Sequence, residues 1–345
     1  LAQRHQVQVF VLHYYPESCS YPLLGAIVHD IGRVDAPLGL RRVEQRRRLS
    51  AAIQSNGPLD VLHAYQGMPT IIAAPIARRL NVPLLATFDS GEATALDDIG
   101  YGLQRRWFDR RSLASAVGLC ARVTVATRFM ACLVRDVLDV LPDEVPIGVE
   151  PSLFPQPRRV EGPRWRLVRV ASINEVKDYP TLLRALSLLI QRGLDVHLAC
   201  VGEDTLNGTA QALTHALGLE SRVTFHGFQP TDRLARFYHL AHLHVASSRH
   251  EAAGVAILEA AATGLATVGT GVGYVADWQP DRALAVPVHD AVALADAIAD
   301  LLRDPARRAG LAAAARDWTL AHDADWSAEQ FERIYREISG TRPVA

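Results

Sequence analysis

Short runs rich in valine and leucine alternate with longer amphipathic stretches along the whole chain. The short runs predict strands covered on both faces, and the longer stretches predict helices. In the first half, the predicted strands are residues 7–12, 59–63, 84–88, 122–126 and 145–149. Helices are predicted between them at residues 41–55, 103–119 and 128–138. Such alternation is typical of parallel sheets wound with helices.

A proline-rich break interrupts this pattern. Pro151, Pro155, Pro157 and the pair Gly162-Pro163 lie close together and predict a linker. The alternation then restarts, with strands predicted at residues 166–171, 195–201, 222–225, 243–246, 266–268 and 283–286. Helices are predicted at residues 181–192, 232–239, 255–263 and 291–302, before an amphipathic helical tail at 307–338.

The whole pattern predicts an α/β protein with two Rossmann-like, doubly wound parallel-sheet domains that face each other across a cleft. We expect the domains to cover residues 1–158 and 159–325, with a last helix in residues 326–345 packing back toward the first domain. Ligands of such sheets bind beyond the carboxyl ends of the strands, so loops of both domains should meet at the cleft.

The composition is that of an ordinary globular protein, with 49% hydrophobic and 21% charged residues in a chain of 345. A formal net charge of -1 provides no general attraction to nucleic acid. The four cysteines form no CxxC pair, which favours a reducing, cytoplasmic location over a disulfide scaffold. The longest apolar run, residues 252–266, is too short to span a membrane and contains Glu259.

The segment 250–260 carries the most informative motif. It follows a buried strand and places Glu251 and Glu259 eight residues apart, with Gly254 between them. Gly254 predicts a helix start near Val255, so Glu251 lies in the loop before the helix and Glu259 lies inside it. Free N–H groups at such a helix start suit a pyrophosphate.

In this arrangement Glu251 can accept hydrogen bonds from sugar hydroxyls, and Glu259 can bind the two hydroxyls of a ribose. The alternative is that both carboxylates are solvated surface groups. Glu259, however, is flanked by Ile257, Leu258 and several alanines. An unused carboxylate is costly in such surroundings, so we favour the binding role.

Lys177 belongs to a second candidate element. It lies just before a predicted helix with Pro180 in its first turn, where a cation would face a phosphate. Taken alone, a solvated lysine is the simpler interpretation. Gly202 and Gly227 each follow a predicted strand, and they suit either close approach to a ligand or an ordinary turn.

The E-x7-E element, the strand–loop–Lys177 element, and Val149-Glu150 after Ile147-Gly148 together resemble the retaining family 4 glycosyltransferases (glycosyl transferases group 1) of GT-B fold. The resemblance covers nearly the whole chain and is strongest over residues 145–337. It implies an enzyme that moves a sugar from a nucleotide-diphosphate sugar to a hydroxyl acceptor with retention of configuration. It also implies an acceptor-side first domain, a nucleotide-sugar-binding second domain, and no metal or other cofactor.

The resemblance further implies specific donor contacts. Lys177 should contact the diphosphate, Glu251 the sugar hydroxyls and Glu259 the ribose. Backbone contacts are expected from Gly254 and Val255, and base contacts near Gly227 and Phe228. We also expect Ser172 and Gly202 to line the nucleotide site.

Three features depart from the family pattern. Ser172 stands where the family has an arginine five residues before the lysine, so one phosphate contact is weaker or comes from elsewhere. Asp89 stands where the family often has a histidine, and we expect it to act in catalysis beside the sugar or acceptor. The family's first strand and glycine-rich loop are absent, and the chain lacks an initiator methionine, so we expect the natural N-terminus to lie upstream.

Two weaker patterns occur in the second half of the chain. His239, His242, His244 and His250 are close in sequence, but no third ligand has fitting spacing, so we expect no metal site. The glycine-rich segment 269–273 lacks the dinucleotide-binding pattern, and we interpret it as a loop near the donor phosphates.

Two basic clusters lie in the first half. The predicted helix 41–55 carries a basic face that either contacts anionic membrane lipid or is solvated and paired with Glu44 and Asp35, the pairing being the simpler interpretation. This face consists of Arg41, Arg42, Arg46, Arg47 and Arg48. The second cluster is a candidate basic wall of the cleft and consists of Arg105, Arg106, Arg110 and Arg111.

Two other functions remain open at this point. One is a non-catalytic sugar-nucleotide-binding partner subunit, which Ser172 and Asp89 favour slightly. The other is a sugar-nucleotide epimerase of GT-B fold, for which Asp89 and Glu92 are the candidate acid–base residues.

Overall fold

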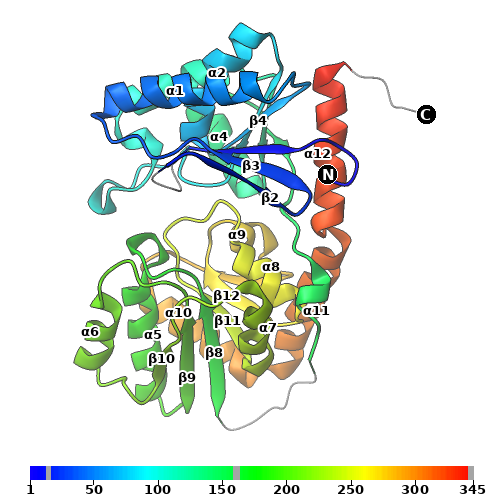
Figure 1. Ribbon diagram of the computed structural model, residues 1–345. Helices are drawn as coiled ribbons and strands as arrows, with labels where there is room; N and C mark the ends of the chain where they lie inside the picture. Colours follow the sequence, from blue (N-terminus) through cyan, green and yellow to red (C-terminus); the bar gives the residue numbers. More distant parts are fainter. Residues whose placement is uncertain (13–16, 158–163, 341–345) are drawn as a thin grey trace.

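The computed structural model describes residues 1–12, 17–157 and 164–340, and shows two α/β halves, one above the other, with a long helix running beside both (Figure 1). Its parallel sheets confirm the predicted fold class. Of the predicted linker, Gly162-Pro163 lies outside the described residues, and Pro151–Leu153 forms a 3-10 turn.

The main sheet of the first half is parallel, with strand order β4-β5-β6-β7. Its central strand β5 (Leu84–Phe88) is buried at every position, as its largely apolar sequence predicts. The other strands are β4 (Leu62–Tyr65), β6 (Arg122–Val125) and β7 (Asp143–Glu144). The helices of this half are α1 (Leu38–Ser55), α2 (Gly67–Leu80), α3 (Trp107–Val117) and α4 (Arg128–Leu138).

A small separate sheet precedes the main one, so the first half is not a single doubly wound sheet. It has the order β1-β3-β2, and β2 pairs antiparallel with β3. The hairpin turns at Leu24 and Gly25, whose φ values are 48° and 83°, and it was not predicted although Gly25 is typical of such turns. The three strands are β1 (Gln8–Val11), β2 (Cys19–Leu23) and β3 (Ala26–Asp30).

The second half contains a six-stranded parallel sheet with the order β10-β9-β8-β11-β12-β13. The strands are β8 (Trp165–Val170), β9 (Val196–Val201), β10 (Val223–Phe225), β11 (Leu243–Ala246), β12 (Thr267–Thr270) and β13 (Ala283–Val286). Helices α5 (Tyr179–Gln191), α6 (Thr209–Ala216), α7 (Thr231–Leu240), α8 (Val255–Ala262), α9 (Tyr274–Trp278) and α10 (Ala291–Arg303) accompany them. Strands β11 and β13 have their predicted bounds, whereas α2, α6 and α9 were not predicted.

The prediction of a strand over residues 145–149 is wrong. Strand β7 ends at Glu144, and Pro146 has no N–H with which to extend the ladder. Beyond it, the backbone N–H of Gly148 donates to the Ser327 hydroxyl at 2.8 Å. This segment therefore binds the last helix instead of a neighbouring strand.

The helical tail is divided into α11 (Pro305–Ala321) and α12 (Ala324–Ser339). Asp323 caps α12 by accepting a hydrogen bond from the Trp326 N–H at 2.9 Å, which starts a new helix at that point. Helix α12 then runs alongside the first half (Figure 1). Phe331 and Ile334 pack there against Leu85 and Val145.

The basic face of α1 is largely paired within the protein. Glu44 accepts hydrogen bonds from Arg47 at 2.7 Å and from Arg48 at 2.8 Å, and Arg42 pairs with Asp109 of α3. The expected pairing with Asp35 is wrong, because Asp35 binds Arg33 of the preceding loop. No described helix is both long and apolar enough to cross a membrane.

Docking of α12 should contribute strongly to stability. Phe331 is 6% exposed, and its ring centroid lies 5.2 Å from that of His63. We expect Phe331→Ala to lower the free energy of unfolding by about 3 kcal/mol, because it leaves a cavity beneath the helix. Urea denaturation measures this loss.

Arg333→Ala is the control on the same helix, since the Arg333 side chain is 62% exposed. It should change stability by less than about 0.5 kcal/mol. Equal effects of the two variants would show that α12 is not held by its apolar face.

Candidate functional site

The carboxyl ends of β8 and β11 enclose a cavity of about 240 Å³. This is the edge of the sheet at which parallel α/β folds bind ligands. The lining residues include Ser172, Lys177, Glu251, Gly254 and Val255 from the predicted set, and Arg169 and His244 in addition.

Helix α8 begins at this cavity. Gly254 precedes it with a φ of +92°, a left-handed conformation that glycine adopts readily. A Cβ atom at Gly254 would stand 2.8 Å from Ile257 Cδ1 and 3.8 Å from the Glu251 carboxyl carbon. The first N–H groups of α8 lack partners within the helix and so can meet an anion there.

Three side chains surround one oxygen of Glu251. Its Oε1 accepts hydrogen bonds from Lys177 Nζ at 2.6 Å and from the Ser248 hydroxyl at 2.7 Å. One guanidinium nitrogen of Arg169 lies 3.9 Å from the same oxygen. Among the described residues, no donor reaches Oε2, so this oxygen is free to accept a hydrogen bond from a ligand.

These contacts decide the charge of Glu251. Burial by itself raises the pKa of its carboxyl, but the charges of Lys177 and then Arg169, with hydrogen bonds from Lys177 and Ser248, lower that pKa overall. Glu251 is therefore a carboxylate at neutral pH, which can accept hydrogen bonds but not donate a proton.

Lys177 is fixed by its backbone while its side chain extends into the cavity. It ends the 3-10 turn Glu175–Lys177, and its N–H donates to Asn174 Oδ1 at 3.1 Å. Its carbonyl accepts from the Ser247 hydroxyl at 2.8 Å, and its side chain remains 22% exposed. Lys177 is also the only lysine in the chain.

Sequence reasoning missed Arg169. It lies on β8, three residues before Ser172, and brings a positive charge to the cavity that Ser172 lacks. The signal was present, because Arg169 stands between Val168 and Val170 in a predicted strand, where a charged residue is unusual.

Glu259 is placed differently from Glu251. It lies in the middle of α8 and accepts a hydrogen bond from the Tyr238 hydroxyl at 2.5 Å, and burial raises its pKa. Glu259 is not among the residues that line the cavity. The Tyr238 ring centroid lies 6.2 Å from that of His244, so Tyr238 connects Glu259 with the cavity wall.

The three other predicted nucleotide-site residues lie at the same edge of the sheet. Gly202 packs against the strand end of β8, where a Cβ atom would stand 2.0 Å from the Ala171 carbonyl oxygen. Its N–H donates to the Gly227 carbonyl at 2.9 Å. Phe228 follows with 74% of its surface exposed, so its ring is available to stack on a planar group.

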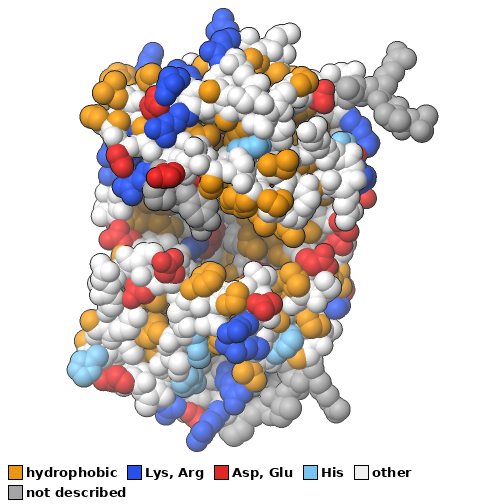
Figure 2. Space-filling model, in the orientation of Figure 1, with side chains coloured by type: hydrophobic (Ala, Val, Ile, Leu, Met, Phe, Trp, Pro, Cys, Tyr) orange, Lys and Arg blue, Asp and Glu red, His pale blue; other side chains and the backbone are white. Residues whose placement is uncertain are grey.

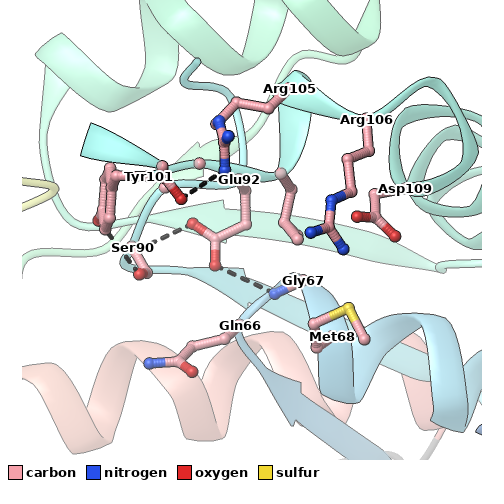
Figure 3. Close-up of a pocket in the computed structure, with 13 residues that line it drawn as sticks. Gln66, Gly67, Met68, Ser90, Glu92, Tyr101, Arg105, Arg106 and Asp109 are labelled. Atoms are coloured by element: carbon pink, nitrogen blue, oxygen red, sulfur yellow. Dashed lines mark hydrogen bonds between the residues drawn. The ribbon is translucent and has the colours of Figure 1, made fainter. Parts of the chain in front are cut away.

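A second cavity, of about 380 Å³, lies in the first half beyond β4 and β5 (Figure 3). The Glu92 carboxylate accepts hydrogen bonds there from the backbone N–H groups of Gly67 at 3.0 Å and Ser90 at 2.8 Å. Burial raises the pKa of Glu92 to about 7. Tyr101, Arg105 and Arg106 complete the polar wall.

Asp89 directly follows β5, next to this cavity, without being one of its lining residues. Burial raises its pKa, opposed by a hydrogen bond from the Gln66 side chain. Its Oδ1 atom has no hydrogen-bond partner among the described residues.

The loops carrying the two cavities touch each other. His250 Nε2 donates to the Ser90 carbonyl at 2.9 Å, and His250 Nδ1 lies 3.2 Å from the Thr94 hydroxyl. Arg249 forms a two-pronged ion pair with Asp98 at 2.6 and 2.8 Å. The loop that precedes Glu251 therefore contacts the first half directly, and the molecular surface is hollowed between the two halves (Figure 2).

The four histidines do not converge. His239 bonds to the Pro155 carbonyl, His242 accepts from the Arg166 N–H, and His244 approaches Thr267. No cluster of three or more potential His, Cys, Asp or Glu ligands occurs in the part of the chain that the structure describes.

Two protein-family models match this chain, one over each half. Residues 1–153 match the model "Glycosyltransferase Family 4", and residues 154–318 match "Glycosyl transferases group 1". The chain is a family 4 glycosyltransferase. This membership favours sugar transfer over the two alternatives, a non-catalytic binding subunit and an epimerase.

Curated relatives agree with this membership. The chain is 27% identical over 316 residues to the D-inositol 3-phosphate glycosyltransferase of Xylanimonas cellulosilytica, covering 85% of this chain and 75% of the relative. It is 28% identical over 301 residues to the phosphatidyl-myo-inositol mannosyltransferase of Mycolicibacterium smegmatis, covering 83% and 73%.

Solved structures show the same fold. Sucrose-phosphate synthase from Thermosynechococcus elongatus superposes with a TM-score of 0.84 at 19% identity, covering 98% of this chain and 90% of that one. Anabaena HepE, solved in complex with UDP and glucose, gives 0.73 at 15% identity, covering 90% and 86%.

The protonation of Glu92 predicts a pH dependence of stability. The folded protein holds this proton up to about pH 7, whereas an ordinary glutamate releases it near 4.5. Ionisation therefore costs stability as the pH rises through that window, by up to about 3 kcal/mol at its upper end.

Glu92→Gln cannot ionise, so its stability relative to the wild type should improve as the pH rises from about 4.5 to about 7. Urea unfolding of both proteins across this range measures the difference. A difference that stays constant with pH would mean that Glu92 is not protonated in the folded enzyme.

Proposed function

We propose that this glycosyltransferase binds the diphosphate of a nucleotide sugar between Lys177 and the start of α8, and transfers the sugar to a hydroxyl acceptor with retention of configuration. The single observation that carries the proposal is the Lys177–Glu251 pair at 2.6 Å beside the N-terminus of α8. A flexible cation, a carboxylate and free N–H groups meet there within one cavity.

In this proposal, binding exchanges one partner of Lys177 for another. The ammonium group turns from Glu251 to the diphosphate and stabilises the negative charge that develops when the sugar–phosphate bond breaks. Glu251, freed from Lys177, accepts hydrogen bonds from the sugar hydroxyls through Oε2. Glu259 is assigned to the ribose and Phe228 to the base.

Retention follows when the acceptor hydroxyl attacks on the face from which the diphosphate leaves. The departing phosphate oxygen then takes the acceptor proton, so no protein nucleophile is needed. The positive charge comes from Lys177 and the α8 N–H groups, and we propose that no metal ion or other cofactor takes part. Transfer should therefore continue in the presence of a chelator.

We place the acceptor in the cavity beside Glu92. Arg105 and Arg106 line this cavity, and no described acidic residue forms an ion pair with Arg106. A phosphorylated polyol therefore suits it, in keeping with the inositol phosphate named for several relatives. Asp89, with one unpartnered oxygen, lies close enough to this wall for a role in binding the acceptor or the sugar.

The donor proposal predicts the behaviour of Lys177→Met. Loss of a charge-assisted contact should weaken binding of UDP, or of GDP if the wild type prefers it, by about 10- to 100-fold. Isothermal titration calorimetry measures this change. Arg184→Met, which removes an exposed charge from α5, is the matched control and should bind as the wild type does.

Two results would contradict the donor proposal. One is wild-type protein that binds no nucleoside diphosphate or nucleotide sugar in a panel covering uracil and guanine. The other is a Lys177→Met variant with unchanged affinity. An anomeric proton of inverted configuration in the product would reject retention while leaving the binding site intact.

The acceptor proposal predicts a selective effect of Arg106→Met. With D-inositol 3-phosphate as acceptor, its KM should rise at least about tenfold, since a charged hydrogen bond to phosphate is lost, while UDP affinity stays unchanged. Arg110→Met, on the exposed side of α3, is the control. Equal use of phosphorylated and free inositol by the wild type would contradict the assignment of these arginines.

A further inference from the structure

Arg169 is a buried charge on a central strand of the second sheet. Its side chain is 2% exposed, yet it lines the same cavity as Lys177 and Glu251. An ionised guanidinium in such a place is costly unless its groups are paired. Its Nη2 atom donates to the Ser248 hydroxyl at 2.6 Å, while Nε has no hydrogen-bond partner among the described residues.

The contacts of Arg169 converge on one atom, Oε1 of Glu251. Ser248 accepts from Arg169 and donates in turn to Glu251 Oε1 at 2.7 Å. Nη2 of Arg169 itself lies 3.9 Å from that oxygen. Arg169 therefore supports the same carboxylate oxygen that Lys177 holds, but it does so from the rigid strand.

Donor binding makes this second support necessary. When Lys177 turns to the diphosphate, Glu251 loses its closest cation while it is still largely buried. A buried carboxylate that loses its partner is strongly destabilised. Another positive charge therefore has to remain beside the Glu251 carboxylate, and Arg169 is close enough to provide it.

We propose that Arg169 is a positioning residue of the donor site, which holds Glu251 in place through Ser248 while Lys177 moves to the diphosphate. This inference rests on the proposed function. It assigns different tasks to the two cations: Arg169 stays with Glu251, and Lys177 changes partners. The competing arrangement is a direct contact between Arg169 and the diphosphate.

A double-mutant cycle on UDP binding separates these arrangements. Arg169→Met is made in the wild type and in Glu251→Gln, and affinities are measured by calorimetry with UDP, or with GDP if the wild type prefers it. We expect about tenfold weaker binding in the wild-type background and less than about twofold in the Glu251→Gln background. An equal loss in both backgrounds would overturn the proposal, because a direct phosphate contact does not depend on Glu251.

Two further variants sharpen the cycle. Arg169→Lys keeps the charge but loses the planar fork, so it should weaken binding less than Arg169→Met does, and a loss as large as that of Arg169→Met would also count against the proposal. Arg166→Met removes an exposed arginine from the same strand and is the matched control, with unchanged affinity expected.

The cycle stays informative if Arg169→Met does not fold, as thermal unfolding would reveal. Ser248→Ala then replaces it, because it breaks the connection from Arg169 to Glu251 without removing a charge. It should show the same dependence on Glu251, and an equal loss in both backgrounds would again overturn the proposal. A wild type that binds no nucleoside diphosphate contradicts the proposed function itself, whereas an additive cycle contradicts only this inference.

Discussion

The charge on Glu251 is the constraint around which the cavity at the start of α8 is built. The side chain is 13% exposed, so its carboxylate persists only because Lys177, Ser248 and Arg169 gather around Oε1. These partners come from the loop after β11, the turn before α5, and the middle of the sheet. A single buried charge thus fixes three segments of the chain at the mouth of α8, where an anionic ligand can reach the free helix N–H groups.

The loop that carries Glu251 also contacts the first half of the chain. Arg249 and His250, the two residues before Glu251, bind Asp98 and the Ser90 carbonyl of the first half. Any movement that separates the halves must therefore pull on the loop that holds Glu251. Closure around the substrates would exclude water and place this carboxylate in the same step, a coupling that suits transfer to a hydroxyl other than that of water.

The sequence predicts this protein well where a local pattern determines the structure. The start of α8 at Val255 follows from Gly254, and β11 from its short run of leucine, valine and alanine around His244, so the E-x7-E element is recognisable without coordinates. The hairpin at Leu24-Gly25 was not predicted, because a single Gly25 is a weak signal without a clear alternation in the flanking strands. Arg169 acquires its meaning only when β8 and β11 pair and bring Ser248 beside it. The surroundings of the Glu92 carboxyl likewise depend on the fold, because its N–H donors are Gly67 at the start of α2 and Ser90 in the loop after β5.

Lys177 and Arg169, the two cations beside Glu251, differ in the way that the tasks proposed for them require. Of the 36 basic residues in the chain, only Lys177 is a lysine. An arginine at this position could hold the Glu251 carboxylate with a planar, two-pronged fork, which makes a stronger and more directional pair. An ammonium group on a flexible stem is a point charge that can change partners. Arg169, fixed on a strand and 2% exposed, is suited to stay. In the proposed exchange, the one lysine thus stands where the charge moves, and an arginine stands where it remains.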